Sequence, residues 1–174
     1  AYRVFEETGT KQMQVLDDEG KNLILRKIAG DYENKLTVLK GNIKKLGYIS
    51  EVKSVISEFT QYDIGEEEMD EMLDHLDEDS RLYYKLKDIR LLYEGFQDYL
   101  RERYITKEEL LDVLNSQVKE SELLKNSVVV LDGFTGFTPV QNRLILELMR
   151  CCKEVWVTVT MDERENPYAY KHPY

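Results

Sequence analysis

Apolar side chains recur every three or four positions over most of the chain before residue 126, which is the spacing of one face of an α-helix. Gly9 and a capping box at Thr106–Glu109 mark two helix boundaries. The chain is therefore expected to be mostly helical. The predicted helices cover residues 2–8, 20–30, 48–62, about 80–103 and 106–119, with a further one beginning at Gly65.

The clearest apolar stripes also predict which helical side chains are buried. The apolar positions over residues 80–103 follow a heptad-like spacing, which requires a partner helix, and packing within one domain is the expected arrangement. Residues 11–16 form either a short strand or a loop. The predicted inner positions are Leu23, Ile24, Ile28 and Ala29 in the first stripe, Ile49, Val52, Ile56 and Phe59 in the second, and Leu82, Leu86, Ile89, Tyr93, Phe96 and Leu100 in the third.

The pattern changes after residue 126. The continuous apolar run Val128–Leu131 is β-branched and too short for a helix, which predicts a strand buried on both faces. Thr138 and Pro139 suit the N-cap and first turn of a helix, and residues 155–160 form a second strand. Strand, helix and strand together predict a parallel pair with a right-handed crossover, so the fold class is α/β.

Two parallel strands cannot bury themselves, because parallel sheets are normally covered on both faces. We therefore expect further strands of this sheet to belong to a longer protein, with the outer face of the pair exposed in this chain. Trp156, in the second strand, is expected in the core.

Composition narrows the classes of protein to which the chain can belong. The 174 residues are 33% charged, with a mean hydropathy of -0.52. No apolar run approaches the roughly 20 residues that a transmembrane helix needs, so no membrane partner is expected. Cys151 and Cys152 are adjacent, and neighbours rarely bridge each other. They are interpreted as reduced, buried thiols, which favours the cytoplasm.

The net charge of -10 is segregated along the chain. Residues 63–80 contain 10 acids and no lysine or arginine, and without them the chain has 24 acids and 24 bases. Either these stretches are solvated helix faces, or the lysine-rich stretch binds DNA phosphates while the acidic one faces elsewhere. The lysines concerned are Lys35, Lys40, Lys44, Lys45 and Lys53.

The first strand ends in Asp132, at the carboxyl edge where α/β proteins bind ligands. In P-loop NTPases an aspartate at this point holds Mg²⁺, and a glutamate that activates water commonly follows it. Here Gly133 follows it, and the phosphate-binding pattern GxxxxGK[ST] does not occur in the 174 residues. Asp162 matches no equivalent role.

The run LDGFTGFTPVQ resembles the Walker B motif of the UvrD/RecB helicases, commonly VDEFQDTNxxQ. Asp132, Phe134 and Gln141 match that motif, whereas Gly133 and the residues Gly136, Phe137 and Thr138 depart from it. The opening AYRV is similar to the helix that follows the TFHSLAYRLL motif of the same helicases. The specific form DGFTGFTP resembles AddB-type subunits of the bacterial AddAB (RexAB-like) helicase–nucleases, and the resemblance covers essentially the whole chain.

This resemblance implies a partial P-loop-type, helicase-like sheet interrupted by a helical insertion. Residues 1–17 would end the first helicase-like segment, 18–125 form the insertion, 126–162 return to the sheet and 163–174 form an irregular tail. Asp132, Gly133 and Gln141 would be remnants of an ATP–Mg²⁺ site, with Asp132 as the Mg²⁺ ligand. The resemblance also implies DNA and an AddA-like helicase subunit as partners in recombinational repair. For the longer protein it implies ATP-dependent helicase and nuclease activity and a 4Fe–4S cluster, whose ligands are not Cys151 and Cys152.

Three functional hypotheses follow. The chain is a non-motor scaffold within a repair helicase–nuclease, part of an active helicase or ATPase, or a purely structural helical interaction domain; this stretch alone has no complete active site. Phe134 and Phe137 either plug the loop against neighbouring helices or stack on bases of single-stranded DNA.

Overall fold

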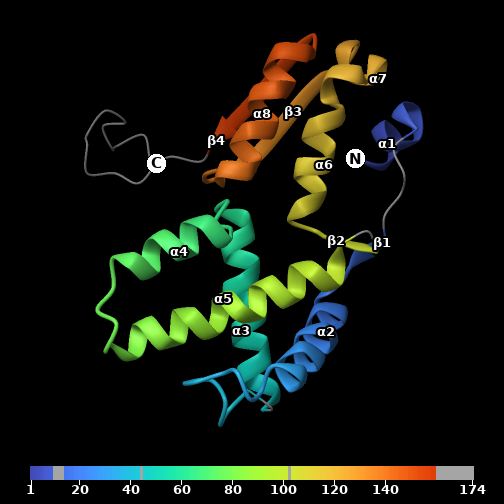
Figure 1. Ribbon diagram of the computed structural model, residues 1–174. Helices are drawn as coiled ribbons and strands as arrows, with labels where there is room; N and C mark the ends of the chain where they lie inside the picture. Colours follow the sequence, from blue (N-terminus) through green and yellow to red (C-terminus); the bar gives the residue numbers. More distant parts are fainter. Residues whose placement is uncertain (10–13, 44, 102, 160–174) are drawn as a thin grey trace. The chain divides into compact units, whose positions relative to one another are not determined.

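The computed structural model of the chain describes residues 1–9, 14–43, 45–101 and 103–159 (Figure 1). Its contacts divide the chain into two compact units. Residues 13–110 form the helical unit, and residues 1–12 together with 111–174 form the sheet unit. The described chain is mostly helical with two small parallel sheets, which confirms the predicted α/β class. The four segments inferred from the resemblance stay a prediction.

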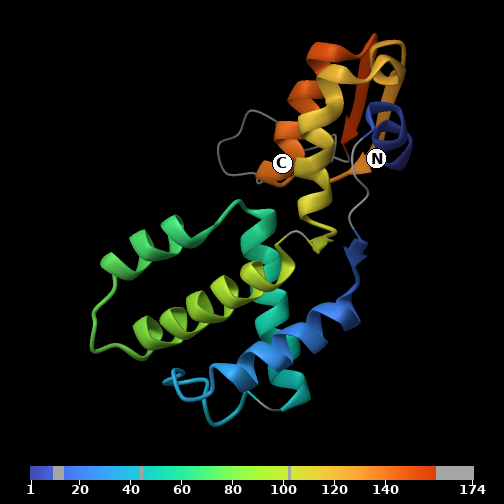
Figure 2. The same cartoon turned by 45° about the vertical axis from the view of Figure 1, so that its right-hand side comes forward.

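The helical unit begins and ends on two short strands that pair with each other in parallel, with Val15 opposite Ile105. Figures 1 and 2 show α4 and α5 side by side, with α3 crossing α5. The strand β2 was missed by the sequence reasoning, which assigned its residues to the loop and cap before the next helix. The elements are β1 (Gln14–Leu16), α2 (Asp18–Asp31), α3 (Leu46–Gln61), α4 (Glu66–Asp74), α5 (Arg81–Leu100) and β2 (Tyr104–Thr106).

The core of the helical unit lies between α2, α3 and α5, and it contains most of the predicted apolar stripes. Gly95 allows α5 to approach α2 closely, because a Cβ at that position would lie 2.7 Å from Tyr32 Cε2 and 2.9 Å from Ile28 Cγ2. Two predicted core positions are wrong. Leu23 is 69% exposed and Leu82 is 58% exposed.

The position of Leu23 has a simple geometric cause. At 3.6 residues per turn, Leu23 falls opposite the middle of the buried face of α2, which comprises Lys21, Ile24, Leu25, Ile28 and Ala29. Leu25 occupies the inner face in its place and is 1% exposed. Leu82 lies in the first turn of α5, ahead of the part of that helix that packs into the core.

The sheet unit contains the predicted strand, helix and strand, and its two strands pair in parallel. Pro139 opens α8 and Thr138 caps it, as predicted. Gly9 ends α1 in the left-handed conformation, with φ of 68°, again as predicted. The elements are α1 (Tyr2–Thr8), α6 (Glu109–Gln117, which starts in the helical unit), the 3₁₀ turn η1 (Val118–Glu120), α7 (Glu122–Lys125), β3 (Val128–Phe134), α8 (Pro139–Cys151) and β4 (Glu154–Val159).

One face of the β3–β4 sheet is open. Val128, Val130 and Trp156 are 54%, 62% and 61% exposed, whereas the alternate positions Val129 and Leu131 are half-buried. Side chains alternate between the two faces of a strand, so the exposed residues share one face. The predicted burial of β3 on both faces and of Trp156 in the core is therefore wrong for the described chain. The expected exposure of the outer face is confirmed.

None of the helices in the described part of the chain combines the length and apolarity needed to cross a membrane.

Candidate functional site

The carboxyl end of β3 places Asp132 and Thr158 together. Because β3 and β4 are parallel and Leu131 pairs with Val157, the next residue of each strand lies at the same edge. The Thr158 hydroxyl donates a hydrogen bond to Asp132 Oδ1 and accepts one from the Gly133 N–H at 3.2 Å. Thr158 was not selected from the sequence, although the parallel register was the signal that could have found it.

Gly133 occupies a backbone conformation that suits glycine. Its φ is 76°, in the left-handed region that residues with a Cβ rarely adopt. The register of the strand pairing shifts between Leu131 and Phe134, so the regular ladder is interrupted at this point. A glutamate placed at residue 133 would therefore meet backbone strain, and the geometry of this turn differs from that of a regular strand end.

Phe134, the last residue of β3, stacks on Phe137 of the loop that follows. The ring centroids of Phe134 and Phe137 lie 5.0 Å apart, with 30° between the ring planes. Both side chains are half-buried. The two rings thus form a small stacked pair at the edge of the sheet. Both predicted roles, plugging the loop against helices and stacking on bases, stay predictions.

Gln141 has a local structural partner. Its side-chain oxygen accepts a hydrogen bond from the Thr138 N–H at 2.9 Å, and its backbone N–H donates to Thr138 Oγ1 at 3.4 Å. This reciprocal pair is a capping box that closes the first turn of α8. The side chain of Gln141 is therefore engaged with the helix end in this structure.

The donor set at the strand end does not fit a complete Mg²⁺ site by itself. Mg²⁺ prefers near-octahedral oxygen coordination, and in the described part of this strand end one carboxylate oxygen of Asp132 already accepts the Thr158 hydroxyl. Within the described ranges, no three His, Cys, Asp or Glu side chains form a group that could hold a metal ion. A 4Fe–4S cluster needs four thiolates, and Cys151 and Cys152 provide only two adjacent, half-buried ones.

The lysines of the basic stretch differ in their availability. Lys35, Lys40 and Lys45 are exposed, and Lys45 Nζ donates a hydrogen bond to Asn42 Oδ1 at 2.8 Å. Lys53 is only 16% exposed, with its Nζ 3.8 Å from Asp18 Oδ1. Lys44 lies outside the described residues. Three of the five predicted phosphate-binding lysines are therefore exposed in the described chain.

Arg90 of α5 binds the acidic stretch through Asp70 of α4. The Arg90 guanidinium donates hydrogen bonds to both carboxylate oxygens of Asp70, and its distance to Oδ2 is 2.9 Å. It also donates to Glu94 Oε2 at 3.1 Å. The hydrogen bond from Arg90 lowers the pKa of Asp70, which favours the charged form of this carboxylate. Arg90 thus offsets part of the negative charge of α4 and holds that helix on α5.

Two buried charged groups were missed by the sequence reasoning. Lys21 is 2% exposed, and its Nζ donates to Glu108 Oε1 and Oε2 at 2.9 and 2.7 Å. Asp88 is also 2% exposed and accepts hydrogen bonds from three consecutive backbone N–H groups, of residues 37–39. The available signal was a charge within a buried stripe, because Leu25 follows Lys21, and Leu92 follows Asp88, by four residues.

Comparisons with known proteins identify the family of the chain. A family model described as "ADDB, N-terminal" matches residues 1–173. Three bacterial relatives are named as the B subunits of ATP-dependent helicase/deoxyribonucleases. That of Lachnoclostridium phytofermentans is 41% identical over 165 residues, that of Clostridium kluyveri 38% over 162, and that of Alkaliphilus oremlandii 36% over 159. The alignments cover 95%, 93% and 91% of this chain and 14% of each relative. The chain thus spans about one seventh of the length of these relatives, and it belongs to the AddB family, in the region described by its N-terminal model.

Proposed function

We propose that this chain is a non-motor part of a helicase–nuclease subunit that processes DNA double-strand breaks for recombinational repair. In this role it provides a helicase-like scaffold for DNA and for an AddA-like helicase subunit, which supplies the motor. The family, and the relatives' names as helicase/deoxyribonuclease subunits, support the setting. The two neighbouring cysteine thiols, free in the structure, are consistent with a reducing cytoplasm.

The single observation that carries the non-motor assignment is the glycine after Asp132. Hydrolysis of a nucleotide needs a group that orients and deprotonates the attacking water, and such assistance is typically worth about 10²–10⁴-fold. Gly133 has no side chain that could act on the water. Its backbone is in the left-handed region, so a glutamate at this position would be strained. The neighbouring Thr158 hydroxyl is already bonded to Asp132, and a hydroxyl is a poor base. Asp162 lies outside the described residues.

Two other functions compete with this one. A fragment of an active helicase would require ATP and Mg²⁺ at Asp132, with the base supplied from elsewhere. A purely structural helical domain would require neither DNA nor nucleotide. The aromatic pair and the left-handed Gly133 at the strand end favour the first proposal over the structural one, because ligands of α/β proteins bind at this edge.

The assignment can be tested in the assembled complex of the full-length subunit with its partner. Replacing Asp132 with alanine is expected to leave DNA-stimulated ATP turnover and unwinding unchanged, because the motor site is in the partner. The matched control is Asp112→Ala, another surface aspartate of the sheet unit, which forms an ion pair with Arg143 at 2.9 Å. A loss of about 100-fold or more in ATP turnover with Asp132→Ala alone would contradict the proposal.

The DNA contact is tested by reversing exposed lysines of the basic stretch. In the full complex, Lys40→Glu with Lys45→Glu is expected to weaken DNA binding most at low salt. The slope of log affinity against log salt should become shallower by about 0.9 for each phosphate that is no longer neutralised. The measurement is a fluorescence anisotropy titration at several salt concentrations.

Lys87→Glu is the control for the lysine experiment, because Lys87 is also exposed but lies on α5, outside the basic stretch. Lys87 rests over the Tyr83 ring, with its Nζ 5.7 Å from the ring centroid. If the Lys40 and Lys45 variants bind DNA like the control at low salt, the basic stretch is a solvated surface and does not bind DNA.

A further inference from the structure

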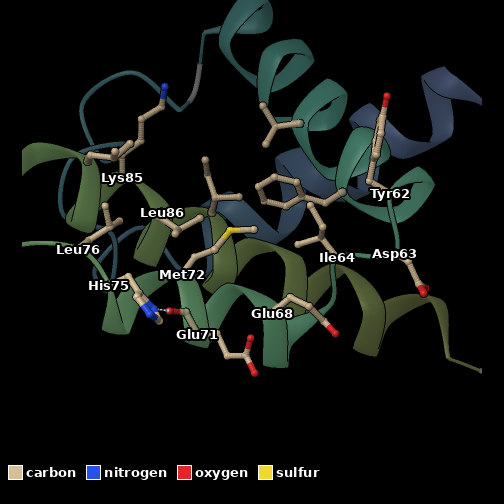
Figure 3. Close-up of a pocket in the computed structure, with 14 residues that line it drawn as sticks. Tyr62, Asp63, Ile64, Glu68, Glu71, Met72, His75, Leu76, Lys85 and Leu86 are labelled. Carbon is tan, nitrogen blue, oxygen red and sulfur yellow. Dashed lines mark hydrogen bonds between the residues drawn. The ribbon is translucent and has the colours of Figure 1, made fainter. Parts of the chain in front are cut away.

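The helical unit contains an open apolar hollow that the proposed DNA role does not use. The hollow has a volume of about 760 Å³ and lies between α3, α4 and α5 (Figure 3). In Figure 3, Met72 from α4 and Leu86 from α5 point into it. We refer to this hollow as the α4 groove. Its central apolar side chains are Phe59, Ile64, Met72, Leu76, Leu82 and Leu86.

Exposed hydrophobic side chains of the helical unit gather at the α4 groove. Among its described residues, four large hydrophobic side chains are exposed, and three of them line the groove: Tyr62 at 53%, Met72 at 39% and Leu82 at 58%. The fourth, Leu23, lies on α2. Single exposed hydrophobic residues are ordinary, whereas a contiguous group around a hollow is typical of an interaction site.

The rim of the α4 groove is acidic. Asp63, Glu68 and Glu71 line it, and Lys85 is the single lysine or arginine among its lining residues. Figure 3 shows Glu68 and Glu71 along the α4 edge, outside the apolar floor. The first turn of α4 adds further carboxylates, and the whole stretch of residues 63–80 has no lysine or arginine. This field repels nucleic acid and attracts a ligand with positive charge.

An apolar trough with an acidic rim is complementary to one kind of ligand. An amphipathic helix presents apolar side chains at positions i, i+3, i+4 and i+7, which can enter a groove between helices. Lysine or arginine beside that stripe would face the carboxylates of α4. We propose that the α4 groove is the docking site for a basic amphipathic helix of a separate protein.

The position of the groove within the helical unit supports a separate protein as the source. The chain enters and leaves this unit through the paired strands β1 and β2, and β2 follows the C-terminal end of α5. The groove uses the first half of α5, from Leu82 to Ile89. At 1.5 Å per residue, Leu82 lies roughly 27 Å along the helix from Leu100. The chain therefore enters and leaves the unit next to the C-terminal end of α5, away from the part of α5 that lines the groove.

The test uses the full-length subunit and a designed probe. The probe is a fluorescein-labelled helical peptide of about 18 residues, five turns, with leucines on one face and lysines beside them. The matched peptide has glutamate at every lysine position. The lysine peptide is expected to bind in an anisotropy titration and the glutamate peptide is not, and the affinity should fall with added salt.

Variants locate the binding. The double variant Met72→Ser with Leu82→Ser is expected to weaken the affinity for the lysine peptide by about tenfold or more, because both apolar anchors are removed. Glu71→Lys, at an exposed position, should weaken it by charge repulsion alone. Leu23→Ser removes another exposed leucine, on α2, and should leave the affinity unchanged. Melting temperatures of all variants verify that the fold is retained. Because Glu71→Lys leaves the apolar floor of the groove intact, it tests the site even if the double serine variant fails to fold.

Three outcomes would overturn the proposal. The first is that the full-length subunit does not bind the lysine peptide, which would mean that its own chain covers the groove or that no helix docks there. The second is equal binding of both peptides. The third is equal affinity of the groove variants and Leu23→Ser.

Discussion

Replacing Asp88 with alanine is expected to lower the free energy of unfolding of the chain by about 3 kcal/mol, one of the two largest effects expected for this protein. The carboxylate of Asp88 accepts four hydrogen bonds from the N–H groups of Thr37, Val38 and Leu39, at 2.8 to 3.0 Å. Hydrogen bonds to a charged group are worth more than neutral ones, and unpaired buried donors carry a desolvation cost. One side chain of α5 thus fixes the loop that follows α2.

Two measurements verify this expectation. Urea denaturation of the chain, followed by circular dichroism, gives the change in stability. Hydrogen exchange of residues 37–39 should become faster in Asp88→Ala, because their donors lose their acceptor. Asp98→Ala is the matched control, since Asp98 lies on the same helix, is 58% exposed and forms an ion pair with the exposed Arg101. Equal stability of the two variants would contradict the anchoring role of Asp88.

The second large effect is expected at the buried ion pair of Lys21 and Glu108. Lys21 Nζ lies 2.7 Å from Glu108 Oε2, and the two side chains are 2% and 12% exposed. Removing one partner of a buried pair costs about 3–5 kcal/mol, because the other charge is left without compensation. Lys21→Met and Glu108→Gln are each expected to fall in this range. The loss of stability in the double variant should be smaller than the sum of the two single losses, because neither charge is then left buried and unpaired.

The same pair predicts a dependence of stability on pH. Burial of the Glu108 carboxyl acts to raise its pKa, but hydrogen bonds from Lys21 and other donors outweigh burial, so the pKa lies below its ordinary value of 4.5. A carboxyl with a lowered pKa in the folded state contributes stability that is complete above about pH 4.5 and is lost as the pH falls through the folded value. Urea denaturation from pH 7 to pH 3 should show a smaller acid loss in Glu108→Gln than in the parent chain. An identical acid loss in both would contradict this account of the pair.

The helices could be predicted because their boundaries and stripes are local features. Ser80 accepts the Tyr83 N–H and opens α5, and Thr138 with Pro139 opens α8 at the predicted point. Burial depends on what covers an element, which a local pattern does not contain. Val130 and Trp156 are residue types typical of a buried strand, yet both side chains are exposed because no layer of the described chain covers their face of the sheet.

The candidate site was predictable only in part for the same reason. Asp132 was placed at the end of β3 by a run of four apolar residues and a turn. Its partner Thr158 is 26 residues away in the chain, and only the parallel register brings the two together. Lys21 and Glu108 are 87 residues apart, so their pairing follows from the fold of the helical unit and could not be derived from spacing.

The most direct test of the central claim, that this part of the AddB family does not power translocation, is ATP turnover by the subunit alone. The full-length subunit is purified without its partner and assayed with single-stranded and double-stranded DNA ends. The account predicts no DNA-stimulated turnover above that of Asp132→Ala, with turnover restored when the partner subunit is added. Robust DNA-stimulated turnover by the isolated subunit, abolished by Asp132→Ala, would contradict it and assign the chain to an active motor.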